Sequence, residues 1–311
     1  MKTIVWNENL RAHEACVATI GMFDGVHRGH GYLLQQLQEE AHRLALPTMV
    51  ITFDKHPRQV LHADFQPEML STYDEKLLRL STMGVDECVV LPFSPSLAAY
   101  TAHDFMQRIL GPQLGVKLLL MGYDNHFGCR KEDVFDDYVS YGMEMGIDVR
   151  QGKALCVDGT NVSSSVVRRC LQQGDILRAN DYLGYAYSLT GTVVTGEHVG
   201  TGIGFPTANL QPDACQLIPA PGVYAVKVMT EDAEEQKIGM MNIGYRPTFG
   251  GHQMTLETHI LHFADNLYGQ RLRIFFVRRL REEQKFDSKE ALMEQLRKDA
   301  EAVSREMNAV L

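Results

Sequence analysis

The feature that most constrains the fold is an apolar segment that runs through a glycine-punctuated turn into a helical pattern. The segment is Cys16–Ile20, and the turn carries Gly21 and Gly25. The helical pattern begins at His30, and its apolar side chains recur on one face: Leu33, Leu34, Leu37, Ala41 and Leu44. In α/β proteins, a strand, a tight turn and a helix in this order hold phosphate, because free backbone N–H groups and the helix dipole point at the anion. The sequence therefore predicts an α/β sheet with an anion site at this turn.

Two histidines stand at the start of the helical pattern, in the run His27-Arg28-Gly29-His30. Imidazoles at this place can donate hydrogen bonds to charge that develops on a phosphoryl group. Two solvent-facing histidines in a turn are the simpler explanation. The pattern H-x-G-H directly after a G-x-F-D-G turn favours phosphoryl chemistry.

The first half of the chain alternates between strand and helix patterns. Apolar strands are predicted at Met49–Phe53, Cys88–Leu91 and Val116–Met121, with helices at Glu75–Met83 and Ala102–Leu110. Strands separated by helices indicate a parallel, doubly wound sheet, whose ligands bind at the carboxyl ends of the strands. Four polar residues follow such strands, and we expect them at one crevice: His27, Asp54, His56 and Asp124.

The pattern changes after a helix that Asp175 caps and that runs toward Gly184. Short alternating or apolar segments follow, at Gly191–Val194, Tyr224–Met229, Ile238–Ile243, Met254–His262 and Leu272–Val277. Several short strands without intervening helices predict a small antiparallel β-barrel. An amphipathic helix capped by Ser288 ends the chain. We expect two domains, residues 1–183 and 187–311.

Bulk composition agrees with two domains and excludes several protein classes. A chain of 311 residues exceeds what one hydrophobic core usually organises. The net charge of −9 argues against a dedicated nucleic-acid binder, although a local positive site can still take phosphate. The six cysteines form no C-x-x-C pair, so neither a zinc cluster nor a disulfide framework is indicated. The N-terminus turns polar too soon for a signal peptide, and no segment approaches the roughly 18 apolar residues of a membrane span. We expect a soluble, cytoplasmic protein without nucleic-acid or membrane partners.

Further motifs occur in both halves. They are Thr52-Phe53-Asp54-Lys55-His56-Pro57, Gly122-Tyr123-Asp124-Asn125-His126-Phe127-Gly128, Ser163-Ser164-Ser165-Val166-Val167-Arg168, Gly204-Phe205-Pro206-Thr207-Ala208-Asn209, Asn242-Ile243-Gly244-Tyr245-Arg246-Pro247-Thr248-Phe249, Glu257-Thr258-His259 and Leu267-Tyr268-Gly269. Together with the H-x-G-H run, they resemble the bacterial bifunctional riboflavin kinase/FMN adenylyltransferase family, also called FAD synthetases, over almost the whole chain. The resemblance implies a Rossmann-like H-x-G-H nucleotidyltransferase domain, then a small antiparallel β-barrel with a C-terminal helix.

The same resemblance implies two ATP-dependent reactions. Riboflavin is phosphorylated to FMN, and FMN is adenylylated to FAD with release of pyrophosphate. ATP is the co-substrate, Mg²⁺ is the cofactor, and FMN and FAD are product ligands. We expect a monomer or a weak homo-oligomer.

For adenylyl transfer, the resemblance implies catalytic roles for His27, His30 and Arg168. Expected nucleotide-binding residues are Gly21, Phe23, Asp24, Gly25, Gly29, Asp124, Ser163, Ser164 and Ser165, and expected flavin-binding residues are His56, Pro57, Asn125 and Phe127. The serines could equally cap a helix. His56 and Pro57 could have a purely structural role. The chain departs from the family at Ser165, usually threonine, at Asn125, usually aromatic, and at His126, commonly arginine.

For flavin phosphorylation, the resemblance assigns Mg²⁺ binding to Thr207 and Asn209, whose oxygens suit this hard ion. Gly204 and Pro206 are expected to bind nucleotide, and Glu257 is expected to be the general base. Thr201 stands where the family generally has arginine or lysine, which predicts weaker ATP binding by this loop. Arg246 could supply the positive charge that is absent at Thr201, or it could have only a structural role in its own loop.

Two other functions remain open at this point. The chain could be an H-x-G-H nucleotidyltransferase for another phosphorylated acceptor, with the barrel as a degenerate module. It could also be a catalytically silent flavin carrier or regulator. Thr207, Asn209 and Glu257 argue against the first alternative, and His27, His30 and Arg168 argue against the second.

Overall fold

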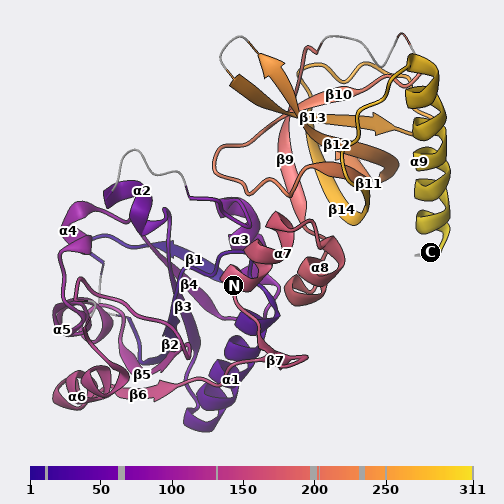
Figure 1. Ribbon diagram of the computed structural model, residues 1–311. Helices are drawn as coiled ribbons and strands as arrows, with labels where there is room; N and C mark the ends of the chain where they lie inside the picture. Colours follow the sequence, from indigo (N-terminus) through magenta and orange to yellow (C-terminus); the bar gives the residue numbers. More distant parts are fainter. Residues whose placement is uncertain are drawn as a thin grey trace. The chain divides into compact units, whose positions relative to one another are not determined.

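The computed structural model describes the chain except for a few short stretches. These are residues 11–12, 62–66, 131, 197–201, 203, 231–234, 249–250 and 310–311. Contacts divide the chain into two compact units, Met1–Ser164 and Ser165–Leu311 (Figure 1). Each unit is described by itself.

The first unit is built on a sheet of six strands in the order β1-β4-β3-β2-β5-β6. The strands are β1 (Lys2–Val5), β2 (Cys16–Ile20), β3 (Thr48–Phe53), β4 (Glu87–Leu91), β5 (Val116–Met121) and β6 (Asp148–Gln151). All five neighbouring pairs are parallel, which confirms the predicted sheet. The strand order reverses at β2 and β5, where doubly wound sheets bind ligands. The edge strands β1 and β6 were not predicted, because both are short and largely polar or exposed.

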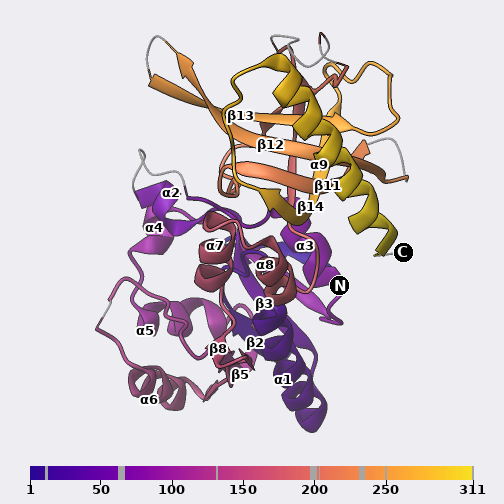
Figure 2. The same cartoon turned by 45° about the vertical axis from the view of Figure 1, so that its right-hand side comes forward.

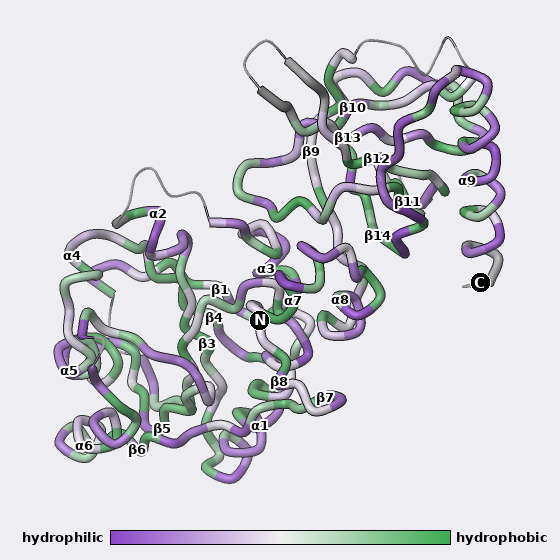
Figure 3. Tube along the Cα trace, in the orientation of Figure 1, coloured by the Kyte–Doolittle hydropathy of each residue, from purple (hydrophilic) through white to green (hydrophobic). Residues whose placement is uncertain are grey.

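Helices cover both faces of this sheet (Figures 1 and 2). They are α1 (Arg28–Leu44), α2 (Pro57–Leu61), α3 (Tyr73–Ser81), α4 (Pro95–Ala98), α5 (Ala102–Phe105), the π-helix η1 (Met106–Leu110) and α6 (Phe135–Met145). Successive side chains of β2 point to opposite faces of the sheet and pack into two separate hydrophobic clusters. Ala18 packs with side chains of α4, α5, η1 and α6, whereas Val17 packs with those of α1 and α3. The central strands are correspondingly hydrophobic along their length (Figure 3).

Three helices differ from the prediction. Helix α3 spans Tyr73–Ser81 and not Glu75–Met83, because Thr72 is its N-cap. Helix α1 begins at Arg28 and not at His30, because His27 is its N-cap and accepts the His30 N–H. Residues 102–110 are not one α-helix. They form α5 and then the π-helix η1, which ends where the Gly111 N–H donates to the Met106 carbonyl. A π-helix of this kind usually forms a single turn inside or beside an α-helix, as it does here.

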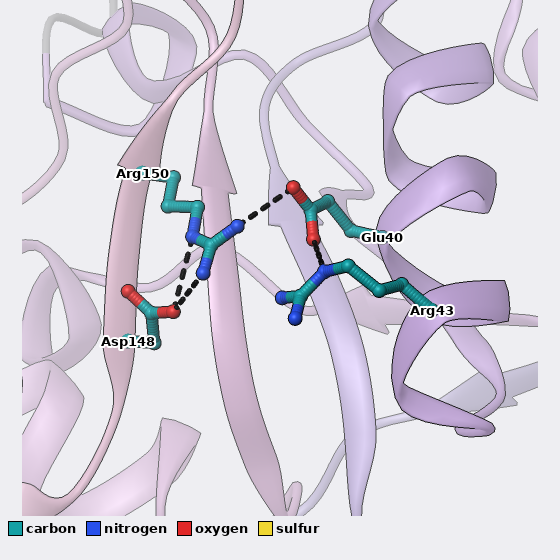
Figure 4. A network of polar contacts seen from close by, with 4 residues as sticks. All are labelled: Glu40, Arg43, Asp148 and Arg150. Carbon is teal, nitrogen blue, oxygen red and sulfur yellow. Dashed lines mark hydrogen bonds and ion pairs between the residues drawn. The ribbon is translucent and has the colours of Figure 1, made fainter.

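Helix α1 is tied to the edge strand β6 by a network of four charged residues (Figure 4). Arg150 contacts Glu40 at 2.7 Å and Asp148 at 2.6 Å, and Arg43 contacts Glu40 at 2.8 Å. The hydrogen bond from Arg43, followed by the charge of Arg150, lowers the pKa of Glu40. Exposed pairs of this kind add little stability. They join the C-terminal half of α1 to β6.

A small hairpin, β7 (Cys156–Val157) and β8 (Thr160–Asn161), closes the first unit. The second unit begins within α7 (Ser164–Gln172), which is followed by α8 (Ile176–Leu183). Asp175 caps α8 and Gly184 ends it in a left-handed conformation, as predicted.

Six antiparallel strands of the second unit close into a barrel in the order β10-β13-β12-β11-β14-β9. The strands are β9 (Ser188–Val194), β10 (Ala208–Pro212), β11 (Gly222–Thr230), β12 (Lys237–Thr248), β13 (Gly251–Ile260) and β14 (Arg271–Arg281). This confirms the predicted barrel. Strand β10 was not predicted as a strand, because it follows a turn motif and ends at Pro212.

The C-terminal helix α9 (Lys289–Ala309) packs on β11 and β12, and Ser288 caps it, as predicted. Val303 lies against Ala225 and Met240 of the barrel. Asp299, which is 4% exposed, receives a bidentate hydrogen bond from the guanidinium of Arg281, with distances of 2.7 and 3.1 Å. Apolar packing and this pair together fix the helix on the barrel wall.

All six cysteines are free thiols, and burial raises the pKa of Cys16 to about 12 and that of Cys88 to about 11. Among the helices of the described ranges, none combines the length and the apolar content needed to cross a lipid bilayer.

Candidate active sites

The turn after β2 has a strained backbone. Phe23, Gly25 and Val26 have φ values of +50°, +76° and +36°. Positive φ is rare for residues other than glycine and is a genuine outlier for a β-branched residue such as valine. The side chains of Phe23 and Val26 are both buried in the core beneath α1, and this packing offsets the strain. Strain of this kind concentrates at functional sites, where it holds side chains in place before a ligand arrives.

Polar contacts fasten the same turn to residues 70–71. The Asp24 carboxylate, which is 3% exposed, accepts hydrogen bonds from the backbone N–H groups of Leu70 at 3.0 Å and Ser71 at 3.3 Å. The Gly25 N–H donates to the Ser71 hydroxyl at 3.2 Å. The structure therefore places Asp24, an expected nucleotide-binding residue, as a buried support of the turn.

Gly29 lets a second segment approach the histidines. A Cβ atom at Gly29 would lie 2.5 Å from the Val162 carbonyl oxygen and 3.0 Å from Nδ1 of His27. Only glycine fits such a distance. The Ser164 hydroxyl donates to the Asp24 carbonyl at 3.0 Å. Residues 162–164, including two of the predicted serines, thus lie beside the turn.

The two histidine rings are stacked, with centroids 3.7 Å apart and planes inclined by 16°. Nδ1 of His27 accepts the His30 N–H at 3.3 Å, so the proton of a neutral His27 resides on Nε2. Burial, followed by the charges of His27 and Lys76, lowers the pKa of His30 well below 6.5. Nδ1 of His30 is buried without a hydrogen-bond partner. Orphaned buried polar atoms are uncommon in folded proteins, and a catalytic role is one explanation for them.

A buried lysine adds a positive charge to this site. Lys76 of α3 is 4% exposed, and its ammonium group donates to the Phe53 carbonyl at 2.7 Å and to the Thr52 hydroxyl at 3.3 Å. Its charge is felt at His30, whose pKa it helps to lower. Sequence reasoning missed Lys76, because a lysine in an amphipathic helix is normally solvent-exposed.

Burial lowers the pKa of Lys76 to about 8 from its usual 10.5, which makes the stability of the protein depend on pH. Between these values the unfolded state binds more protons than the folded state, so stability rises with pH. Relative to Lys76→Met, the parent is expected to gain about 2 kcal/mol between pH 7.5 and 10. Urea unfolding of both proteins across this range measures the difference. A difference that does not change with pH would contradict a buried ammonium group.

An apolar cavity of about 380 Å³ opens at the carboxyl ends of the strands. It is lined by Ile20, Gly21, Met22, Phe53, Pro57, Phe93, Leu97, Ala98, Tyr100, Phe105, Asn125, His126, Phe127, Gly128 and Cys129. Phe53 meets Phe93 edge-on, and Phe105 meets Phe127 in the same way, each pair with ring centroids 5.5 Å apart. A cavity of this size with aromatic walls suits a planar, largely apolar ligand.

Of the four expected flavin-binding residues, Pro57, Asn125 and Phe127 line this cavity. The Asn125 amide donates to the Ile20 carbonyl at 2.6 Å, which joins the loop after β5 to the end of β2. His56 does not line the cavity, and its Nδ1 instead accepts the Arg58 N–H at the start of α2. Asp124 is exposed beside Tyr123, outside the cavity lining.

The second unit has a separate polar site on strand β13. Glu257 is half-buried and faces away from its buried neighbours Leu256 and Thr258. Its carboxylate lies 3.5 Å from the Thr207 hydroxyl, and Asn209 stands opposite Glu257 in the β10–β13 register. The structure therefore brings together three residues that are up to 50 positions apart in sequence.

The turn before Thr207 needs glycine, because Gly204 has a φ of +82°. Pro206, Thr207 and Ala208 also line a cavity of about 150 Å³, together with Val193, Thr258, Ile260 and residues 263–268. Gly196 leaves room for the Asn209 side chain, since a Cβ there would lie 2.0 Å from its amide nitrogen. Thr201 lies outside the described residues, as does the side chain of Arg246.

Comparison with known proteins identifies both halves. A family model described as FAD synthetase matches residues 9–166, and one described as riboflavin kinase matches residues 183–307. A bifunctional riboflavin kinase/FMN adenylyltransferase from Escherichia coli strain K12 is 39% identical over 302 residues, which cover 97% of this chain and 96% of that protein. The chain belongs to the bifunctional riboflavin kinase/FMN adenylyltransferase family.

Two further similar proteins extend the comparison. The bifunctional riboflavin kinase/FMN adenylyltransferase of Pseudomonas fluorescens is 39% identical over 297 residues, covering 94% of each chain. A crystal structure described as a macrolide-efflux protein from Streptococcus pneumoniae has a TM-score of 0.86 and 28% identity, and covers 98% of this chain and 99% of that one. The fold of this chain is therefore shared along nearly its whole length.

Helix α7 crosses the division between the two units of the chain. Ser163 and Ser164 belong to the first unit, whereas Ser165 and Arg168 belong to the second. Within α7, Arg168 is half-buried, while Ser165 and Arg169 are exposed. Arg169 is therefore a surface charge.

Proposed function

We propose that the chain makes FAD from riboflavin in two reactions at two separate sites. The domain of residues 187–311 phosphorylates riboflavin with ATP to give FMN and ADP. The domain of residues 1–183 joins FMN to the adenylyl group of a second ATP and releases pyrophosphate. The observation that carries this proposal is that each family match contains its own polar site, the histidine turn in one and the Thr207–Glu257 pair in the other.

In the kinase reaction, the Glu257 carboxylate takes the proton of the terminal ribityl hydroxyl of riboflavin. The oxygen then attacks the γ-phosphorus of ATP, the bond to the β–γ bridging oxygen breaks, and ADP leaves. Glu257 suits this role because it is half-buried and 3.5 Å from Thr207, beside the nucleotide-binding turn of Gly204 and Pro206.

The residues beside Glu257 fit Mg²⁺. The Thr207 hydroxyl and the Asn209 amide offer oxygen ligands, which this ion prefers, and β13 brings a carboxylate to both. When bound, the ion would neutralise negative charge on the ATP phosphates. Thr207 and Asn209 are the residues that would hold it.

In the adenylyl transfer, the apolar cavity takes the isoalloxazine ring of FMN, with Pro57, Asn125 and Phe127 in its wall. A phosphate oxygen of FMN attacks the α-phosphorus of ATP, and the α–β bridging bond breaks. His27 and the neutral His30 donate hydrogen bonds to the reacting phosphates. Arg168 and the three serines 163–165 bind the departing pyrophosphate.

This proposal is tested by incubating the purified chain with riboflavin, ATP and Mg²⁺ and separating the flavins by chromatography. FMN is expected first and FAD later, and a reaction without either product would contradict the proposal. FAD formation from FMN, without any FMN from riboflavin, would indicate a nucleotidyltransferase with a degenerate barrel. Flavin binding, seen as fluorescence quenching, without ATP turnover would indicate a carrier.

A further inference from the structure

The Gly204–Asn209 segment carries the candidate magnesium ligands, but only its end belongs to the barrel ladder. Strand β10 pairs with β13 through Ala208–Thr258 and Asn209–Glu257. Pro206, two residues earlier, has no N–H and cannot donate to a neighbouring strand. The orientation of Thr207 therefore depends on contacts other than the ladder.

One such contact comes from His259, two residues after Glu257 on β13. Its Nδ1 lies 2.8 Å from the Pro206 carbonyl oxygen. Because a carbonyl oxygen only accepts hydrogen bonds, Nδ1 carries the proton. The ring also meets Phe205 edge-on, with centroids 5.2 Å apart. The imidazole thus holds the segment on both sides of the Phe205–Pro206 peptide.

Glu257 and His259 are two positions apart on one strand, so their side chains leave the same face. Glu257 reaches the Thr207 hydroxyl at 3.5 Å, and His259 reaches the carbonyl group directly before Thr207. Strand β13 therefore contacts the turn through two neighbouring side chains. The first contact is made by Glu257, the proposed base. The second is made by His259 and sets the position of the Thr207 hydroxyl oxygen relative to Glu257.

We propose that His259 is a positioning residue for riboflavin phosphorylation. It holds the Pro206 carbonyl so that the Thr207 oxygen keeps its place beside Glu257. His259 does not touch the reacting atoms in this role. The inference rests on the proposed kinase function of the barrel, and it adds a residue that supports the turn from the strand that carries the base.

The test uses the full-length protein and three variants: His259→Ala, His259→Asn and Thr255→Ala. A displacement of about 1 Å in a reacting group can cost about 100-fold in rate. His259→Ala is expected to lower kcat for riboflavin phosphorylation by about 10- to 100-fold, with KM for riboflavin changed less than about threefold. The Mg²⁺ concentration for half-maximal rate is expected to rise. His259→Asn places an amide N–H near the position of Nδ1 and is expected to restore most of kcat.

Circular dichroism and thermal unfolding of the same samples report whether the barrel of each variant is folded, and adenylylation of supplied FMN reports that the other reaction is unaffected. Thr255→Ala shortens a side chain on the same face of β13, on the other side of Glu257. It is expected to keep the rates of riboflavin phosphorylation and FMN adenylylation. Full kinase activity in His259→Ala would overturn the inference, as would equal losses in His259→Ala and His259→Asn. An equal loss of kinase activity in Thr255→Ala would also overturn the inference, because shortening any side chain on this face of β13 would then lower the rate. A parent protein that makes no FMN would instead contradict the proposed function itself.

Discussion

Glu257→Ala is expected to abolish FMN formation from riboflavin while FAD formation from supplied FMN continues. Removing a general base typically costs about 10²- to 10⁴-fold in rate. The half-buried carboxylate lies in the barrel unit, whereas the histidine turn belongs to the other unit. Chromatographic assays of the two reactions, each started from its own flavin substrate, measure both rates in one preparation.

Two further variants sharpen this experiment. Glu257→Gln keeps the size of the side chain and removes its basicity, so it is expected to lose as much kinase activity as Glu257→Ala. Glu235→Ala removes an exposed glutamate of the same unit and is expected to leave both rates unchanged. Loss of both activities in a folded Glu257→Ala protein would rule out separate sites.

His27→Asn is expected to have the opposite effect, with adenylyl transfer lost and riboflavin phosphorylation kept. Asparagine is a favourable N-cap, so its side-chain oxygen can still accept the His30 N–H that Nδ1 of His27 accepts now. The Nε2–H donor disappears, however. Loss of one donor to a developing oxyanion costs about 10²- to 10³-fold in kcat. The rate of FAD formation from FMN and ATP measures this loss.

The matched control is His42→Asn, which changes an exposed histidine in the last turn of the same helix. It is expected to keep full activity. The thermal midpoint of His27→Asn should stay near that of the parent, because the cap is preserved. His27→Ala should lose about 1 kcal/mol of stability in addition to activity. An active His27→Asn protein would show that the imidazole acts only as a helix cap.

Much of this architecture could be predicted from local patterns in the sequence. Strands β2 and β5 have the predicted bounds, because continuous apolar runs bounded by turn residues leave little choice. The caps at Asp175 and Ser288 were also predicted, since a helix terminus is decided by a few neighbouring residues. By contrast, β10 follows a turn motif whose pairing partners are distant in sequence, and no local signal reveals it.

The candidate site residues could be selected from the sequence alone, but the contacts around them could not be predicted from it. The H-x-G-H run and the Pro206–Asn209 segment predict phosphate chemistry, because these residue types and spacings are local properties of the chain. Only the tertiary structure decided that Asp24 is buried against residues 70–71, that Lys76 is a buried cation and that His259 grips the Pro206 carbonyl. These contacts join residues 46, 23 and 53 positions apart. Burial and hydrogen bonding depend on which strands become neighbours, and neither periodicity nor motif spacing contains that information.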